Sequence, residues 1–429
     1  MKKSLKIAII SVCAVLAAAG ICAGVYFGCI DPTRGTVKDY QETLPLDWLL
    51  TRKQAEDDLE FVMEHLRGRH PAWLEENEVM AAAEAQYQTE LVSLSDVPSV
   101  EELWRAAARI TSVMHDGHTL VYASLPGRYV NDFDSLRNSG TLVAINGEAA
   151  ADIFARARTL FPYETDEYAI HHFSSTVLMN EKYLRLVGVD TSNGVVYTFE
   201  KDGETTDISY DLVPIEEVTG YDGGDSKWVY YDIDTENSIG IFTLTECTYN
   251  DEYKAVVKEF FEAVKKNGIC DIIVDLRGNG GGNSMVADEF LRYIDIDSYY
   301  GWASKVRYGN FLRTNERCLE SNEKLEPPFG GNIYLLTNVF TYSAAMDFAM
   351  LVGDNDIGVI IGEASGNLPD SYGDSLSFRL PNSKLDLNVS FKKWYRVDES
   401  KAGQPIEPDH PCDPNDALEK AYELINESR

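Results

Sequence analysis

A serine that could act as a nucleophile lies at residue 343, within the run Thr341 to Ala345. The run follows an apolar segment, Ile333 to Thr337, that predicts a strand, and it precedes apolar residues that predict a helix. A serine at the start of a helix is ordinarily an N-cap, whose hydroxyl accepts a hydrogen bond from the first turn. The small side chains of Ala344 and Ala345 also leave room around the hydroxyl, where the helix N-terminus would stabilise negative charge on an acyl oxygen. Both interpretations of Ser343 fit the residues.

A histidine that could activate such a serine lies at residue 118, in the run His115 to Thr119. Serine is a poor nucleophile until a base removes its proton, and imidazole does this near neutral pH. Gly117 permits a sharp turn beside His118, which favours His118 as the base. A surface turn is one alternative, and a metal-binding pair formed by the two histidines is another. No further cluster of His, Cys or acidic residues with ligand spacing accompanies the pair, so we predict no metal.

A glycine-rich loop, Leu276 to Asn283, could bind the oxygen that becomes negative in such a reaction. It follows an apolar strand and opens a helix, which directs its backbone amides toward the crevice at the carboxyl end of the strand. No Gly-Lys-Ser/Thr sequence follows, and Asn283 stands where a dinucleotide-binding loop needs glycine, so we exclude both nucleotide loops. A tight turn that uses glycine only for its positive φ is the structural alternative.

The chain changes its pattern twice between these three segments. Residues 45–118 carry apolar side chains at helical spacing behind two capping boxes, which predicts a helical N-terminal domain. Short apolar runs broken by Gly, Asn and Asp predict a β-rich region over 119–235. Strands and helices alternate over 236–415, which predicts an α/β core with a mostly parallel sheet, and residues 416–429 are predicted to form a C-terminal helix.

The first thirty residues differ in kind from the rest. Three lysines precede an uncharged run, Ile7 to Ile30, that is long enough to cross a bilayer as a helix. We predict that residues 1–30 form a single-pass membrane anchor with the catalytic portion outside the cell, followed by a linker over 31–44. A cleaved signal peptide, processed near Ala17 to Ala19, would instead leave a secreted protein, and lipidation at Cys29 is a third alternative.

The charge balance narrows the range of partners. The chain has 70 Asp and Glu against 38 Lys and Arg, which gives a formal net charge of −32. Nucleic acid is therefore excluded as a partner, because binding to phosphates needs a basic surface. The seven cysteines show neither metal-ligand nor disulfide-scaffold spacing, and we interpret them as thiols, with one disulfide outside the N-terminal segment as the alternative.

Taken together, these segments resemble the tail-specific or C-terminal processing peptidases of family S41, and the likeness covers most of residues 45–415. The segments that carry it stand in the order typical of the family: Asp116-Gly117-His118-Thr119, Asp275 to Gly281, Ser343-Ala344-Ala345, Gly362-Glu363 and Ile406 to Asp409. The resemblance implies a ClpP/crotonase-like α/β core. Residues 140–148 look like the late strand and turn of the PDZ modules that many members use to grip substrate tails, and a β-rich lid over the cleft is the alternative.

The resemblance also implies roles for individual residues. Ser343 is the nucleophile, and the backbone N–H groups of Ala344 and of Gly280 or Gly281 form the oxyanion hole. Family members with a Ser–Lys dyad carry a lysine shortly after Gly-Glu, but none follows Gly362-Glu363 in this chain. The chain therefore resembles the tricorn-like branch, in which a histidine, here His118, takes the place of that lysine.

An acid should hold the imidazole in its useful tautomer. We predict Glu399 for this role, from its place before Gly403 and the Pro408-Asp409 pair, with Asp398 and Glu363 as alternatives.

The predicted function is hydrolysis of polypeptides by a serine endopeptidase through an acyl-enzyme, without metal or cofactor. One rival is a non-catalytic peptide-binding relative, because Met346 stands where the family commonly has an acidic residue. A second is a crotonase-like acyl hydratase or hydrolase, which would need a basic groove for CoA that this acidic chain does not indicate.

Overall fold

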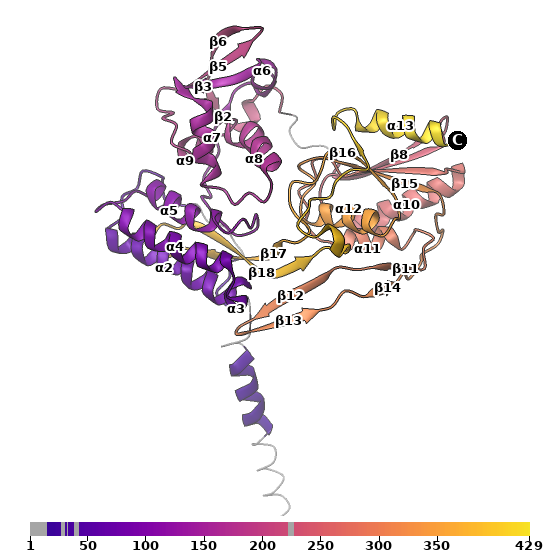
Figure 1. The fold of residues 1–429 in the computed structure, drawn as a ribbon, viewed down its shortest axis with the longest axis horizontal. Coiled ribbons are helices and arrows are strands. Elements are labelled where there is room, and N and C mark those ends of the chain that lie inside the picture. Colours follow the sequence, from indigo (N-terminus) through magenta and orange to yellow (C-terminus); the bar gives the residue numbers. More distant parts are fainter. Residues whose placement is uncertain (1–14, 27–30, 32, 38–42, 222–226) are drawn as a thin grey trace, which may run out of the picture.

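The computed structural model describes residues 15–26, 31, 33–37, 43–221 and 227–429. Residues 15–25 form a helix that stands clear of the body of the molecule (Figure 1). Among the described residues, no helix has both the length and the apolar character that a membrane crossing requires. The anchor predicted over residues 1–30 lies largely outside the described residues, and it stays a prediction.

The N-terminal region is helical, and its core is completed by strands from the far end of the chain. Its helices are α2 (Arg52–Arg69), α3 (Ala72–Glu75), α4 (Glu78–Ser93) and α5 (Val100–Ser112). The capping box is present at the start of α2, where the Thr51 hydroxyl accepts from the Gln54 N–H and the Gln54 side chain accepts from the Thr51 N–H. The apolar faces of these helices share one hydrophobic core with β17 (Tyr372–Arg379) and β18 (Asp386–Tyr395).

The middle region mixes a small sheet with short helices. Its strands are β2 (Tyr129–Val130), β3 (Thr141–Ile145), β4 (Glu148–Ala149), β5 (Val195–Lys201), β6 (Glu204–Tyr210) and β7 (Leu212–Val213). Its helices are α6 (Phe133–Asn138), α7 (Ala150–Arg158), α8 (Asp166–His172), the π-helix η2 (Phe173–Val177) and α9 (Glu181–Leu186). Strands β4-β3-β5-β6 form an antiparallel sheet. The region is thus more helical than the sequence indicates, because helices of six to nine residues are too short to show a clear helical period.

The core contains a sheet with the strand order β19-β16-β15-β10-β9-β8. These strands are β8 (Val229–Asp234), β9 (Ile239–Leu244), β10 (Asp271–Asp275), β15 (Asn332–Thr337), β16 (Val359–Gly362) and β19 (His410–Pro411). All neighbours are parallel except β8, which is antiparallel to β9. Because β10 and β15 are parallel neighbours, the glycine loop after β10 and the serine turn after β15 leave the same edge of the sheet side by side.

Helices cover both faces of this sheet. Helices α10 (Asp251–Asn267), α11 (Met285–Leu291) and α12 (Ala344–Asp354) pack on one face and α13 (Ala417–Ser428) packs on the other (Figure 1). Strand β15 shows why both faces are apolar, since Ile333 and Leu335 face the three helices while Tyr334 and Leu336 face α13.

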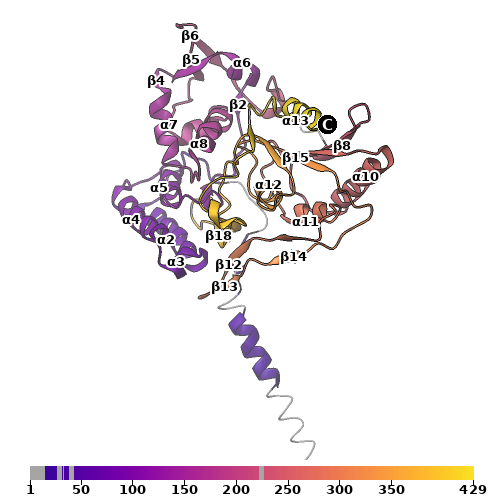
Figure 2. The same cartoon turned by 45° about the vertical axis from the view of Figure 1, so that its right-hand side comes forward.

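A second sheet joins the N-terminal helices to the core. It contains β1 (Leu120–Tyr122), β12 (Ala303–Tyr308), β13 (Phe311–Asn315), β17 and β18, and a separate strand pair is formed by β11 (Ser298–Tyr300) and β14 (Leu319–Ser321). Strand β18 lies between the N-terminal helices and the core in both views (Figures 1 and 2). Strand β1 begins two residues after His118 and pairs with β18, and the Ser390 N–H donates to Thr119 Oγ1 at 2.9 Å. This pairing places the histidine turn beside the core, although 225 residues separate His118 from Ser343 in the sequence.

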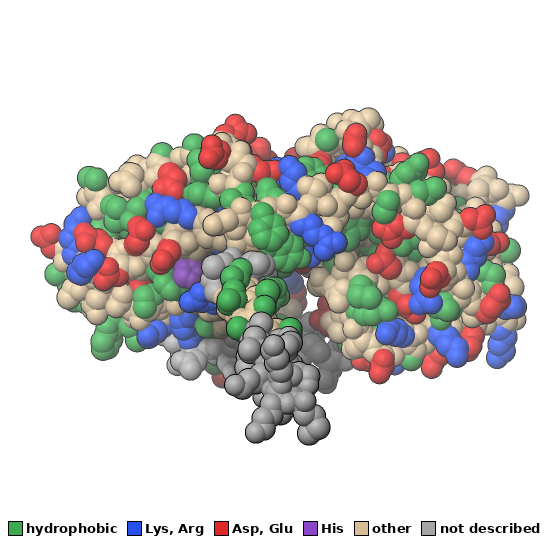
Figure 3. All heavy atoms as spheres, turned by 90° about the horizontal axis from the view of Figure 1, so that it is seen from below, with side chains coloured by type: hydrophobic (Ala, Val, Ile, Leu, Met, Phe, Trp, Pro, Cys, Tyr) green, Lys and Arg blue, Asp and Glu red, His purple; other side chains and the backbone are tan. Residues whose placement is uncertain are grey.

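The face on the side of the N-terminal segment carries charges of both signs. Figure 3 shows the face on the side of the N-terminal segment, where acidic and basic side chains are interspersed over the described residues. This face presents no continuous basic surface of the kind that binds nucleic acid.

Candidate active site

Ser343 occupies a sharp turn between β15 and α12. Its φ of 53° and ψ of −123° lie outside the regions that non-glycine residues favour, which costs about 1–3 kcal/mol. The turn is held on two sides, because the Ser343 N–H donates to Oδ1 of the buried Asn367 at 3.0 Å and the Tyr342 N–H donates to the Asn279 carbonyl at 2.9 Å. The Ser343 side chain does not make the hydrogen bond of an N-cap. Its hydroxyl is therefore available for chemistry.

The imidazole of His118 lies beside this hydroxyl. Its Nε2 is 3.1 Å from Ser343 Oγ, which is hydrogen-bond distance. The ring also packs against the Tyr342 ring, with centroids 5.7 Å apart. The other ring nitrogen, Nδ1, is buried and has no hydrogen-bond partner in the described part of the chain. The carboxylate oxygen of Asp116 lies 4.0 Å from it, which is beyond hydrogen-bond distance but within strong electrostatic reach.

Asp116 is a buried carboxylate that organises the histidine turn. Its Oδ1 accepts from the backbone N–H of His118 at 2.9 Å, and its Oδ2 lies 3.1 Å from Nε2 of the buried His70. Nδ1 of His70 accepts from the Ala72 N–H at 3.2 Å, so the proton of a neutral His70 ring lies on Nε2 and is donated to Asp116. Burial alone would raise the pKa of Asp116, but the hydrogen bond from His70 and the nearby imidazoles lower this pKa to about 2. A negative charge therefore stands next to His118 at neutral pH.

Glu164, from the segment between α7 and α8, joins the site from the middle region. Its carboxylate accepts from the Gly117 N–H at 3.1 Å and from the Leu368 N–H at 2.9 Å, and the Tyr342 hydroxyl lies 3.3 Å away. Burial raises the pKa of Glu164 to about 8. Gly117 is required here, because a Cβ at this position would lie 1.8 Å from the Tyr342 hydroxyl. No motif marks Glu164 in the sequence, and only the folded chain brings it to the histidine turn.

The side chains of Asp116, His118 and Glu164 also form the kind of group that can hold a metal ion. One ligand atom of each lies within 4.8 Å of the others. The carboxylate oxygens of Asp116 and Glu164 already accept hydrogen bonds from backbone N–H groups and from His70. These hydrogen bonds account for the proximity of the three side chains without an ion.

The glycine loop lies directly against the serine turn. A Cβ on Gly281 would lie 2.7 Å from the Cβ of Ser343 and 2.8 Å from the backbone nitrogen of Ala344, so only glycine fits. The Gly281 N–H donates to Asn279 Oδ1 at 2.8 Å, which engages one of the two predicted oxyanion donors inside the loop. Gly282, which the sequence does not single out, lines the same cavity as Ser343 and Ala344.

The cavity beside Ser343 has a volume of about 370 Å³, which suits a side chain or a short peptide segment. Its wall combines Ser343 and His118 with indole rings and charged side chains. The residues that line it are His118, Gly282, Asn283, Ser284, Trp302, Ser343, Ala344, Met346, Asp347, Asn367, Ser371, Gly373, Asp374, Lys392 and Trp394.

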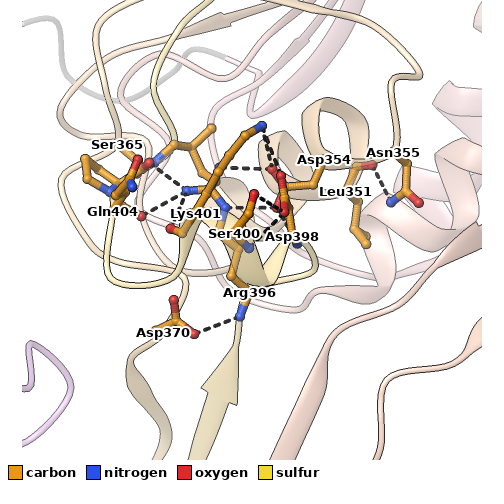
Figure 4. Close-up of polar contacts among 12 residues, drawn as sticks. Leu351, Asp354, Asn355, Ser365, Asp370, Arg396, Asp398, Ser400, Lys401 and Gln404 are labelled. Atoms are coloured by element: carbon orange, nitrogen blue, oxygen red, sulfur yellow. Dashed lines mark hydrogen bonds and ion pairs between the residues drawn. The ribbon is translucent and has the colours of Figure 1, made fainter.

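The structure does not bring Glu399 to His118. The segment that carries Glu399 is attached to Asp354, whose carboxylate accepts from the Asp398 N–H at 3.1 Å and from Arg396 at 2.9 Å (Figure 4). Asp354 is the last residue of α12, whereas Ser343 precedes the first, so about 16 Å of helix separates the two ends. The Glu399 carboxylate is 80% exposed and pairs with Arg317.

The two alternative acids are also engaged elsewhere. The Asp398 side chain accepts from the N–H and the hydroxyl of Ser400, and the Glu363 side chain faces the Val339 N–H at 3.5 Å. Among the described carboxylates, only that of Asp116 lies within 4.0 Å of a His118 ring nitrogen. The sequence could not favour it, because a residue two positions before the base looks like part of a turn.

Comparisons with known proteins place the fold of the chain. The model of peptidase family S41 matches residues 238–412, from β9 to just past β19. The fold is similar to that of mature CPAF in complex with lactacystin, with a TM-score of 0.60 and 14% identity over 88% of this chain and 97% of that chain. It is also similar to a candidate peptidase from Parabacteroides merdae, with a TM-score of 0.51 and 15% identity over 86% of this chain and 96% of that chain. No curated protein matches the sequence significantly. At these identities the structural likeness shows a shared fold that extends beyond the core to the N-terminal and middle regions.

Proposed function

We propose that this chain, which belongs to peptidase family S41, cleaves polypeptides with Ser343 as the nucleophile and His118 as the general base. The observation that carries the proposal is the distance of 3.1 Å between His118 Nε2 and Ser343 Oγ, at the edge of a cavity large enough for substrate. The strained backbone of Ser343 supports it further, because such strain is typical of a nucleophile presented on a turn between a strand and a helix.

The reaction proceeds through a covalent intermediate. His118 Nε2 accepts the hydroxyl proton while Ser343 Oγ attacks the carbonyl carbon of the scissile peptide bond. The tetrahedral intermediate then collapses as the amine leaves with the proton from His118, and the acyl group stays on Ser343 as an ester. A water molecule, deprotonated by the same ring, attacks the ester and releases the carboxylic acid and the free serine.

Negative charge on the carbonyl oxygen is stabilised at the N-terminus of α12. The Ala344 N–H is the first of that helix, and the helix dipole adds to its effect. The backbone of the glycine loop packs against this N–H, which makes the loop the natural source of the second donor.

Positive charge on His118 is stabilised by Asp116. During the reaction the ring carries a proton on both nitrogens, and the ionised carboxylate of Asp116 lies 4.0 Å from Nδ1. The hydrogen bonds that hold Asp116 to His70 and to the His118 backbone fix this charge in position. In this proposal Asp116 is a positioning residue and takes the role that the sequence assigns to Glu399.

A fluorophosphonate probe tests the proposal, because it labels only an activated serine. We expect stoichiometric labelling of the full chain at Ser343, located by peptide mass spectrometry, and cleavage of an unfolded protein substrate. Ser343→Ala should abolish both, and His118→Ala should slow labelling by about 100-fold or more, the usual contribution of a general base. His410→Ala is the matched control, since His410 lies in β19 away from the cavity lining, and it should label at the normal rate.

Failure to label the folded protein would contradict the proposal and favour a non-catalytic peptide-binding relative. Labelling that survives His118→Ala undiminished would reject His118 as the base while leaving Ser343 as the nucleophile.

A further inference from the structure

Asp347 places a carboxylate in the wall of the cavity next to the nucleophile. It lies in the first turn of α12, and its N–H donates to the Ser343 carbonyl at 2.8 Å. Both residues line the same cavity.

This carboxylate has no counter-ion within the described part of the chain. No hydrogen bond or ion pair joins its side chain to another described residue, although it is only partly exposed to solvent. The other acidic residue of the cavity, Asp374, pairs with Lys392. The charges of Asp374 and Lys392 cancel, so an ionised Asp347 leaves the cavity with one uncompensated negative charge, which a partly buried site retains only at a cost.

The rest of the cavity fits a long cationic side chain. Trp302 and Trp394 supply indole surfaces, and Met346 adds a flexible apolar contact for an aliphatic stem. The chain itself gives an example of this chemistry, because the Lys392 ammonium pairs with Asp374 and lies 4.9 Å from the centre of the Trp394 ring.

We propose that the cavity beside Ser343 binds a lysine or arginine side chain of the substrate next to the scissile bond, with Asp347 as its counter-ion. The proposal rests on the proposed function and deepens it, because it names the class of peptide that the site cleaves. Asp347 is then the residue that determines specificity.

The electrostatics of the cavity agree with this assignment. Burial, together with the smaller effects of the Asp374 and Asp288 carboxylates, raises the pKa of Asp347 to about 7. Lys392 and His118 are the other groups that can be charged in the cavity wall. A substrate cation supplies the charge that favours the ionised form of Asp347, so binding of the cation and ionisation of Asp347 reinforce each other.

Matched peptides test the proposal on the full chain. Quenched fluorescent peptides that differ only in lysine against norleucine, or arginine against citrulline, report the charge preference, and mass spectrometry of the products shows on which side of the cleaved bond the residue lies. We expect the lysine and arginine peptides to be favoured in kcat/KM by roughly 10- to 100-fold, as for a hydrogen bond to a charged group. Asp347→Asn should bring the ratio close to one, whereas Asp356→Asn, on an exposed turn beyond the other end of α12, should keep it.

Equal cleavage of the charged and neutral peptides by the unchanged protein, a preference for acidic residues, or a lysine preference that survives Asp347→Asn would each overturn the proposal. A second measurement is independent of turnover, since benzamidine should slow fluorophosphonate labelling of Ser343 more strongly than neutral benzamide, and Asp347→Asn should remove the difference. If Ser343 is labelled and benzamidine gives no protection, only the proposed cation pocket is rejected. Absence of labelling rejects the peptidase itself.

Discussion

The two ends of helix α12 each hold a carboxylate, but only the carboxylate at the C-terminal end has a counter-ion among the described residues. At the C-terminal end, the Asp354 carboxylate is almost fully buried and is matched by the Arg396 guanidinium at 2.9 Å, the Lys401 ammonium at 3.6 Å and the Asp398 N–H. Figure 4 shows these partners arranged around Asp354, and the Arg396 guanidinium also donates to the Gln404 carbonyl. The charged side chains of Asp354, Arg396 and Lys401 at this end therefore all have partners.

The N-terminal end of the same helix keeps groups without partners. In the described chain, the Asp347 carboxylate has no counter-ion and Nδ1 of His118 has no hydrogen-bond acceptor, while Ser343 is held in a strained conformation. Buried polar groups are normally paired, so a concentration of exceptions at one place indicates a site built for something that arrives from outside. This difference supports the proposal that the unpaired groups at the N-terminal end serve catalysis, whereas the paired groups at the C-terminal end stabilise the fold.

The largest effect is expected from replacing Ser343, the strained residue at the N-terminal end of α12. Ser343→Gly should lower peptidase activity by about 10⁴-fold or more, because the nucleophile is lost, yet raise the free energy of unfolding by about 1 kcal/mol, because glycine adopts a φ of 53° without strain. Activity assays and denaturant titration measure the two effects. Ser343→Ala is the control, since it removes the hydroxyl but keeps the Cβ, and it should lose activity without the gain in stability. A glycine variant less stable than the alanine variant would show that the turn is not strained.

The next effect concerns the other end of the helix. Arg396→Met should lower the free energy of unfolding by about 3 kcal/mol, because it leaves Asp354 buried without its main counter-ion. The rate of fluorophosphonate labelling below the unfolding transition should change little, since Asn367 and Asn279 hold the serine turn independently of Arg396. Denaturant titration and labelling rates give the two readouts.

A second substitution sharpens this test. Adding Asp354→Leu to Arg396→Met should restore most of the lost stability, because it removes the unpaired charge that causes the loss. If the double variant is as unstable as Arg396→Met alone, the loss comes from the packing of the arginine and not from the charge of Asp354.

Much of the fold follows from local patterns in the sequence. The alternation of strands and helices after residue 236 predicts the parallel core, and the capping box at Thr51 predicts the start of α2. The short helices of the middle region and the β17–β18 strands that complete the N-terminal core do not follow in this way. Their stability comes from contacts between distant segments, such as the packing of Phe378 and Leu387 against α2, and no local period records those contacts.

The residues of the candidate site also divide into those that local sequence motifs predict and those that only the structure reveals. Ser343, His118 and the glycine loop stand in recognisable motifs, so they can be named from the sequence. Asp116 stands in the same motif as His118, but its role, like the roles of Glu164 and Asp347, depends on what surrounds it: a buried histidine, two backbone amides and an open cavity, respectively. Burial and distance decide which of 70 acidic residues acts on the chemistry, and neither can be read from residue order.

The smallest catalytic effect is expected at the two candidate acids. Asp116 lies beside His118, near the N-terminal end of α12, and the segment that carries Glu399 lies near its C-terminal end. Asp116→Asn should lower kcat/KM by about 100-fold, because it removes the fixed anion that stabilises the positive charge formed on His118 during the reaction. A purely structural role for Asp116 would instead lower the free energy of unfolding and leave the activity of the folded fraction unchanged. Glu399→Gln is the matched control, since its exposed side chain pairs with Arg317, and it should keep activity within about twofold and stability within about 0.5 kcal/mol. A large loss of activity in Glu399→Gln, with Asp116→Asn unaffected, would reverse the assignment and require the segment carrying Glu399 to leave Asp354 during catalysis.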